Sequence, residues 1–212
     1  METEKQDIIE RRNYLVDKFV NATPREVLAH LPSSIGEQFQ GEWALYSCSM
    51  FSAALTNISR LYPETAQDNI SYIQRLIDTV MSPELRAYDT NRWGEDALET
   101  LHGNKSHISY ISHLAWMICG YKSVGGDDRY DAVLSKLCET MNRRILSSPS
   151  LNLPTYPGES IYVPDMLVAI VALKQYSQMI DNLYSSTVDK WLAKAQREWL
   201  DEESGLLVSF LG

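Results

Sequence analysis

Apolar residues recur along this chain at intervals of three and four residues, and no long stretch alternates with a period of two. That spacing places apolar side chains on one face of an α-helix, whereas a half-buried β-strand requires alternation. It predicts an all-α protein with helices at 5–20, 43–61, 65–81, 106–124, 128–146, 163–180 and 184–200. Prolines lie at or outside the expected helix ends, as helix geometry requires. They are Pro63, Pro83, Pro149, Pro157 and Pro164.

The connections between the expected helices alternate between short and long. Short turns with the sequences YPET, GGDD and MIDN predict antiparallel helical hairpins. The long segments 21–42, 82–105 and 147–162 recur with the hairpins at a period of about 60 residues, which is typical of a solenoid or an α/α toroid. We expect an N-terminal helix and long loop over 1–42, followed by a single toroid domain over 43–212.

The charge balance excludes some classes of partner. The 212 residues include 19 Lys and Arg against 28 Asp and Glu, a formal charge of −9, whereas nucleic acids and anionic membranes need a basic surface. The longest apolar runs, 114–121 and 166–173, are shorter than the roughly 20 residues of a membrane span. The charged N-terminus lacks a signal-peptide pattern, and we expect a soluble, cytoplasmic protein.

The cysteines and short motifs predict no metal and no cofactor. The chain has three cysteines, Cys48, Cys119 and Cys138, and no two of them have the spacing of metal ligands. An odd number without that spacing argues against a disulfide framework or a structural zinc site. We interpret them as small core residues. The chain has no glycine-rich phosphate loop, no nucleophile elbow and no suitably spaced pair of acidic metal ligands.

Polar and aromatic residues suited to acid–base chemistry gather in the long loops and at the starts of the helices that follow them. They are Trp93, Asp96, His107, Tyr110, His113, Tyr156, Glu159, Tyr162 and Asp165. Such a mixture in an apolar pocket supports general acid–base catalysis. Structural explanations also stand: Asp165 suits the first turn of a helix electrostatically, and His113 suits a hydrogen-bonded core position.

The segment Tyr110-Ile-Ser-His113-Leu-Ala-Trp-Met117, followed by Arg129-Tyr130, resembles the helical signature of the linalool dehydratase/isomerase family. The similarity extends over about 43–208. It includes Tyr46-Ser47, Tyr62-Pro63, Arg92-Trp93-Gly94, Tyr162 to Leu173, Trp191-Leu192 and Asp201 to Leu206.

The resemblance implies an (α/α)₆ toroid with a mostly apolar central pocket. A complete ring of this kind has about twelve helices and seven are expected here, so the chain is expected to be a fragment, an open half-ring, or a ring completed by another chain. An open half exposes its apolar inner wall, which favours association into a homo-oligomer.

The resemblance also implies cofactor-independent hydration, dehydration or isomerisation of a small isoprenoid alcohol. Within it, Tyr46 corresponds to a pocket tyrosine and His113 to a pocket histidine that takes part in acid–base chemistry. Two cysteines of the family's enzyme correspond here to Tyr156 and Asp165, which differ from a thiol in pKa and in hydrogen bonding.

The first hypothesis is therefore a lyase or isomerase. His113 and Asp165 transfer protons, Tyr46 and Tyr156 orient the substrate hydroxyl, and aromatic walls including Trp93 stabilise positive charge. The remaining candidates, Tyr110, Tyr162, Glu159, Asp96 and His107, are expected to line the substrate pocket.

Two alternatives remain open. In a carbohydrate-active toroid, Trp93, Tyr156 and Tyr162 stack on sugar rings and Asp96, Glu159 or Asp165 supply carboxylates. Those carboxylates would lie about 5–5.5 Å apart in a retaining enzyme or about 6.5–9.5 Å apart in an inverting one. In a non-catalytic helical scaffold or binding domain, His113 and Asp165 point into packing or solvent and share no cavity.

Overall fold

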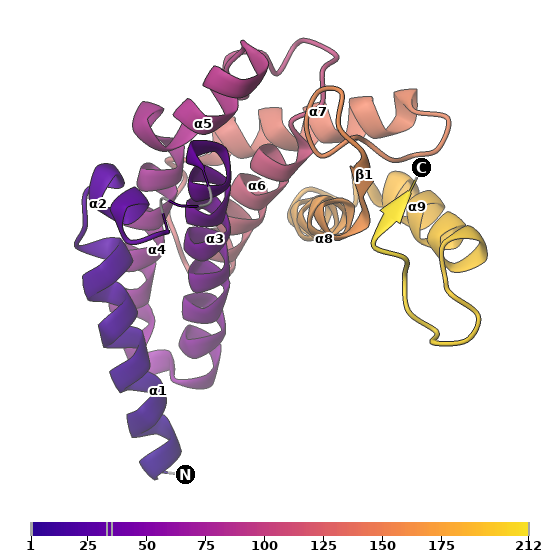
Figure 1. Ribbon diagram of the computed structural model, residues 1–212. Helices are drawn as coiled ribbons and strands as arrows, with labels where there is room; N and C mark the ends of the chain where they lie inside the picture. The colour runs from indigo at the N-terminus through magenta and orange to yellow at the C-terminus, as the bar shows by residue number, and fades with distance from the viewer. Residues whose placement is uncertain (1, 33, 35, 212) are drawn as a thin grey trace. The chain divides into compact units, whose positions relative to one another are not determined.

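A computed structural model describes residues 2–32, 34 and 36–211, and most of them are helical (Figure 1). The prediction of an all-α protein is confirmed, with a two-stranded sheet as the regular non-helical element of the described residues. Within those residues, no helix is both long and apolar enough to cross a membrane. The chain divides into two compact units, Met1–Asp96 with Gly120–Asp128, and Ala97–Cys119 with Arg129–Gly212.

Unit 1 is built around one long helix. Its elements are α1 (Glu2–Leu15), a π-helical turn η1 (Val16–Val20), α2 (Pro24–Ala29), α3 (Glu37–Leu61), a 3₁₀ turn η3 (Pro63–Thr65), α4 (Ala66–Met81) and α5 (Pro83–Trp93). Helix α3 packs against α2, α4 and α5, and α4 also contacts α5 (Figure 1). The core between them contains Leu45, Leu55, Ile73, Leu76, Ile77, Val80 and Leu85, all fully buried.

Unit 2 contains three helices that pack against one another and a short two-stranded sheet formed by residues 161–162 and 210–211. Its elements are most of α6 (Ile108–Ser123), α7 (Asp131–Ser147), β1 (Ile161–Tyr162), α8 (Val163–Met179), α9 (Ser185–Glu198) and β2 (Phe210–Leu211). Helices α7, α8 and α9 contact one another. Strand β2 pairs antiparallel with β1, so the last residues of the chain lie beside the start of α8.

Each of the seven predicted helices is present, with ends that differ by a few residues. The largest difference is at α3, which begins at Glu37 rather than at 43. The short YPET connection correctly predicted a packed helix pair, because α3 and α4 lie together on either side of η3.

Two expected long loops are wrong over part of their length, because each contains a helix. In 82–105, Ser82 caps α5 by accepting a hydrogen bond from the Leu85 amide at 3.2 Å, Pro83 is the first helical residue, and Gly94 ends the helix at φ +74°. The segment PELRAYDTNRW has few apolar residues, so its periodicity gave no signal.

The segment 21–42 contains α2, which begins with a capping box. The Thr23 hydroxyl accepts from the Glu26 amide, and the Glu26 carboxylate accepts from the Thr23 amide at 2.8 Å. The helix is a short one, PREVLA, and buries only Val27. The expectation of a long loop after the first helix was therefore wrong at α2.

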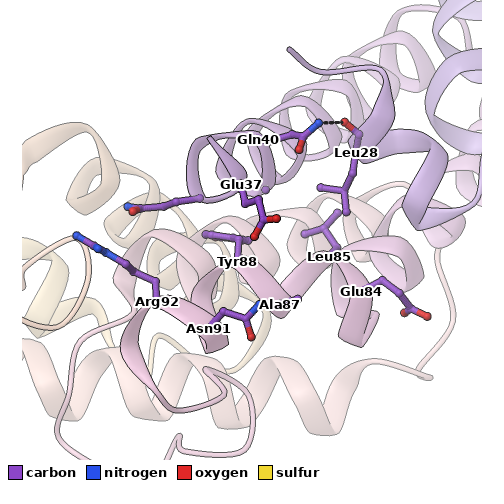
Figure 2. A pocket seen from close by; sticks show the side chains of 11 residues that line it. Leu28, Glu37, Gln40, Glu84, Leu85, Ala87, Tyr88, Asn91 and Arg92 are labelled. Carbon is purple, nitrogen blue, oxygen red and sulfur yellow. Dashed lines mark hydrogen bonds between the residues drawn. The ribbon is translucent and has the colours of Figure 1, made fainter. Parts of the chain in front are cut away.

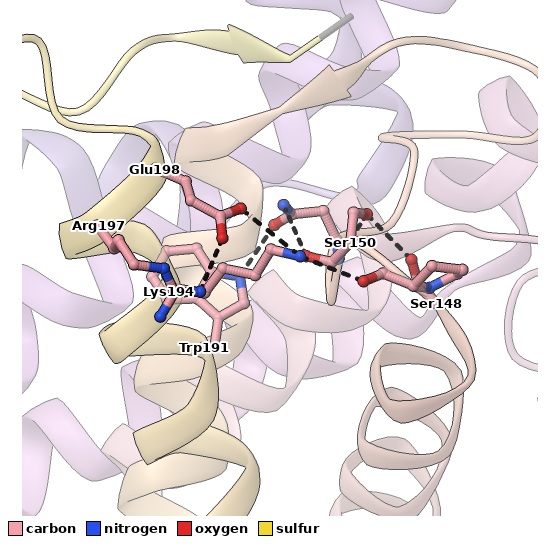
Figure 3. Close-up of polar contacts among 8 residues, drawn as sticks. Ser148, Ser150, Trp191, Lys194, Arg197 and Glu198 are labelled. Carbon is pink, nitrogen blue, oxygen red and sulfur yellow. Dashed lines mark hydrogen bonds and ion pairs between the residues drawn. The ribbon is translucent and has the colours of Figure 1, made fainter.

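The loop before β1 is fixed by side chains of α9 (Figure 3). Trp191 is fully buried, and its indole Nε1 donates to Asn152 Oδ1 at 2.9 Å. Lys194 Nζ donates to the Pro149 carbonyl at 3.2 Å and lies 3.6 Å from Glu198 Oε2. These contacts hold an irregular segment against a helix, because the Pro149 carbonyl and the Asn152 side chain obtain partners there.

Gly41 lets α3 approach α5 closely, and we expect Gly41→Ala to destabilise the protein. A Cβ at this position would overlap Cβ, Cγ and Cδ1 of the buried Tyr88. Alanine improves helix propensity by about 1 kcal/mol, but forced overpacking costs about 1–3 kcal/mol and requires backbone movement here. Urea denaturation should show a lower free energy of unfolding.

The control is Ser71→Ala on α4 of the same unit, where the side chain is exposed. We expect that change to stay within about 0.5 kcal/mol of the parent protein. A Gly41→Ala protein as stable as the Ser71→Ala control would contradict the close packing of α3 on α5.

Candidate active site

A buried pair of titratable side chains marks unit 2. His113 lies on α6 and Asp165 lies in the first turn of α8, with each side chain only 3% exposed. His113 Nε2 and Asp165 Oδ1 are 3.9 Å apart. That separation is longer than a hydrogen bond, yet short enough for strong electrostatic coupling in a medium of low dielectric constant.

The start of α6 is held by the loop that carries Tyr156. Ser106 Oγ donates to the Pro154 carbonyl and accepts from the Ile108 amide at 3.3 Å. The Ser109 amide donates to the Thr155 carbonyl at 3.3 Å. These contacts give partners to amide groups that a helix N-terminus otherwise leaves without one. They also place the Tyr156 backbone beside the first turn of α6.

The start of α8 is held by the end of the chain. The Val163 amide donates to the Ser209 carbonyl at 2.9 Å, and the rings of Tyr162 and Phe210 lie 4.9 Å apart between centroids. Pro164 is among the first helical residues, where its missing N–H costs nothing. The carboxyl of Asp165 is therefore fixed in the first turn of α8.

Burial lowers the pKa of His113 from 6.5 to about 4. Removing the imidazole from water disfavours its charged form, so at neutral pH the ring is neutral, with one nitrogen that accepts a proton and one that donates. The Trp116 ring lies edge-on to the imidazole, with centroids 6.3 Å apart and planes at 74°. A neutral imidazole beside a carboxyl is an arrangement able to exchange a proton.

Further buried polar groups belong to the same elements. They are Ser106, His107, Ser109, Tyr110 and Ser112 on or before α6, and Asn152 and Tyr156 in the loop between α7 and β1. The sequence analysis named His107, Tyr110 and Tyr156 but missed the serines. The sequence signal for the serines was their spacing of three residues, at 106, 109 and 112. In the structure, Ser112 Oγ donates to the Ser109 carbonyl at 3.3 Å.

The other predicted residues of unit 2 lie nearer its surface. Glu159 is exposed, in a turn where its amide donates to the Tyr156 carbonyl at 3.1 Å. Tyr162 is half-buried against Phe210.

Three predicted site residues belong to unit 1, whereas His113 and Asp165 belong to unit 2. Tyr46 is half-buried on α3, and its hydroxyl donates to Glu42 Oε1 at 3.1 Å. Trp93 is half-buried at the last residue of α5. Asp96 forms an ion pair with Arg86, in which both side chains are largely buried. That pairing gives Asp96 a structural role within unit 1.

A groove in unit 1 lies where α2, α3 and α5 meet (Figure 2). Its volume is about 450 Å³, within the usual range for small-molecule sites. Leu28, Leu85 and Tyr88 supply apolar surface, and Glu37 and Arg92 supply charge. None of the residues predicted from the sequence as site residues lines this groove.

The three cysteines are buried, as predicted for core residues. Burial raises the pKa of both Cys48 and Cys119 to about 12 and raises that of Cys138 further. A reactive thiol needs a lowered pKa, so these side chains are inert at neutral pH. The residues that the structure describes contain no group of three or more His, Cys, Asp and Glu able to hold a metal ion.

Comparison with models of known protein families gives no match, and comparison with curated proteins gives none either. The function therefore has to be inferred from the chemistry of the residues in the structure.

The lowered pKa of His113 predicts that the protein loses stability in mild acid. Between pH 6.5 and about 4 the unfolded chain binds a proton at this residue and the native protein does not, so the free energy of unfolding falls as the pH falls. A shift from 6.5 to about 4 corresponds to about 3 kcal/mol. Urea denaturation at several pH values between 7.5 and 4.5 measures the slope.

His113→Gln should flatten this pH dependence, whatever its effect on stability at neutral pH. His102→Gln is the matched control, because His102 is exposed. Equal slopes in His113→Gln and the parent protein would show that the imidazole is not buried in its neutral form.

Proposed function

We propose that unit 2 carries an acid–base site that adds or removes water, or shifts a double bond, in a small and largely apolar alcohol. The observation that carries the proposal is the buried pair of His113 and Asp165, 3.9 Å apart. Burying two titratable groups is costly, and such pairs concentrate at sites of proton transfer.

In the proposed dehydration, Asp165 in its protonated form donates a proton to the substrate hydroxyl. The C–O bond breaks with its electron pair on oxygen, and water leaves. The neutral imidazole of His113 then takes a proton from the adjacent carbon, and the C–H electron pair forms the new double bond. A water molecule that bridges the 3.9 Å gap then carries that proton from the imidazolium to the Asp165 carboxylate, which restores both groups, and hydration is the reverse sequence.

The lowered pKa of His113 supports its assignment as the base. A ring that is neutral at pH 7 is available to accept a proton without first losing one. Tyr156 and Tyr110 are buried in the same unit and supply hydroxyls that orient the substrate oxygen in the proposal. Aromatic rings such as Trp116, which faces His113 edge-on, stabilise positive charge that develops on carbon.

The proposal extends to the (α/α)₆ toroid and to membership of the linalool dehydratase/isomerase family. These parts depend on the resemblance of the sequence. The all-α fold and the burial of His113, Asp165, Tyr110 and Tyr156 agree with them. Tyr46 and Trp93 belong to unit 1 and are not part of the site proposed for unit 2.

A scaffold expects His113 and Asp165 to point into packing or solvent and to share no cavity. Both side chains are buried rather than in solvent, and their separation of only 3.9 Å supports the enzyme proposal. A glycosidase needs two available carboxyl groups, but Asp96 is paired with Arg86 and Glu159 is exposed.

Asp165→Asn should abolish turnover in the parent protein's best reaction. Gas chromatography after incubation with a panel of short isoprenoid alcohols and alkenes detects the products. An amide cannot act as the acid, so we expect the rate to fall by at least about a hundredfold, with His113→Gln giving a similar loss. Asp189→Asn, at an exposed position on α9, should retain full activity.

Circular dichroism of each variant separates loss of chemistry from loss of fold. Asp165→Asn that folds and remains fully active would remove Asp165 from the mechanism. A folded parent protein that converts no member of the panel would count against the whole proposal and favour the scaffold.

A further inference from the structure

Helix α3 has an exposed apolar strip on the side away from the core of unit 1. Its large residues are Phe39, Trp43, Met50 and Leu61, which are 51%, 48%, 53% and 67% exposed. Half-buried Tyr46 and exposed Ala54 and Asn57 lie between them. At 3.6 residues per turn, these seven positions span only roughly 80° of the helix circumference and about 33 Å of its length.

The opposite side of α3 is also apolar, because Leu45, Cys48 and Leu55 are fully buried in unit 1. A surface helix needs one apolar face, and a helix that is apolar on two sides normally has contacts on both. No residue of the strip is charged, although the chain carries a net charge of −9. Such a row of exposed Trp, Phe, Leu and Met marks an interaction surface.

We propose that this strip binds the same strip of a second copy of the chain, with the two α3 helices antiparallel and a two-fold axis at Met50. In that register, facing residue numbers add up to 100. Trp43 then faces Asn57 of the second copy, Tyr46 faces Ala54 of the second copy, and Phe39 faces Leu61 of the second copy. The largest side chains thus meet smaller ones, and only Met50 meets itself.

This self-complementarity is what a two-fold interface requires, because one surface must fit its own copy. Alternating large and small residues across two facing helices allows them to interdigitate at the density of a protein core. A parallel arrangement would instead set Trp43 against Trp43 and Asn57 against Asn57. The sequence of the strip therefore selects the antiparallel register.

Charges at the ends of α3 favour the same orientation. Glu37 lies in its first turn and Arg60 in its last turn, and both are exposed. An antiparallel pair brings Arg60 near the first turn of the second copy's helix, with the helix dipoles also opposed favourably. This association does not depend on the proposed chemistry of unit 2, so either proposal can fail alone.

Sedimentation equilibrium over the micromolar range tests the association. We expect the mass of the parent protein to rise with concentration from 24.2 kDa toward twice that value. Met50→Asp places two carboxylates against each other on the two-fold axis and should leave a monomer throughout. Leu183→Asp is the control, since Leu183 is 62% exposed in unit 2 and its replacement should not change the association.

Oxidative crosslinking tests the register. The natural cysteines are buried, so an introduced thiol is the accessible one. Met50→Cys should form a disulfide-linked dimer. A mixture of Phe39→Cys and Leu61→Cys proteins should crosslink to each other, whereas neither should crosslink alone.

A parent protein that stays monomeric at all concentrations would overturn the proposal. So would a dimer that Met50→Asp leaves intact. Efficient crosslinking of Phe39→Cys to itself would overturn the antiparallel register.

Discussion

Two neighbouring arginines of α7 hold the irregular segment on which the start of α6 depends. Arg144 is almost fully buried, and its guanidinium donates to the carbonyls of Gly103 and Thr100 at 3.2 and 3.1 Å. Arg143 donates to the Leu101 and Gly103 carbonyls at 2.8 and 3.0 Å. A buried guanidinium without such acceptors would be very costly, and unpaired carbonyls in this segment would be costly too. Each group therefore requires the other, and together they fix the path of the chain toward His107 and His113.

The candidate site contrasts with this segment in its electrostatics. Backbone carbonyls accept hydrogen bonds from both guanidinium groups. His113 loses its charge because burial disfavours the imidazolium, and its pKa falls to about 4. The two helices that carry the pair are both tied at their N-termini, α6 by the loop near Thr155 and α8 by Ser209. A pair held on two fixed helices keeps its separation, which the proposed acid–base chemistry requires.

The sequence predicted helices well where an apolar face is buried, and poorly where capping defines the helix. The stripe of α4, with Ile73, Leu76 and Ile77 on one side, was visible without a structure. Helix α5 buries only Leu85, Tyr88 and Asp89, so its signal was the Ser82-Pro83 start and the Gly94 end. The strands were missed because each has two residues, and their pairing joins segments about fifty residues apart.

For the candidate site, the sequence indicated residue types but not which of them meet. His113 and Asp165 were named from a resemblance and from position, and their burial within 3.9 Å depends on how α6 and α8 pack. Asp96 shows the opposite case, because its partner Arg86 lies on a helix that periodicity did not reveal. A carboxylate that looked available in a loop is paired, since the loop was partly a helix.

Helix α3 shows why apolar periodicity alone does not say what a face contacts. Its buried side, with Leu45 and Leu55, and its exposed side, with Trp43 and Met50, are equally apolar in sequence. The structure separates them, because burial by α4 and α5 accounts for one side only. The exposed side has large residues in its first half and smaller ones at the positions that would face them in an antiparallel second copy. A hydrophobic surface that merely completed the core of one chain would have no reason to show that symmetry, whereas a surface that meets a second copy across a two-fold axis would.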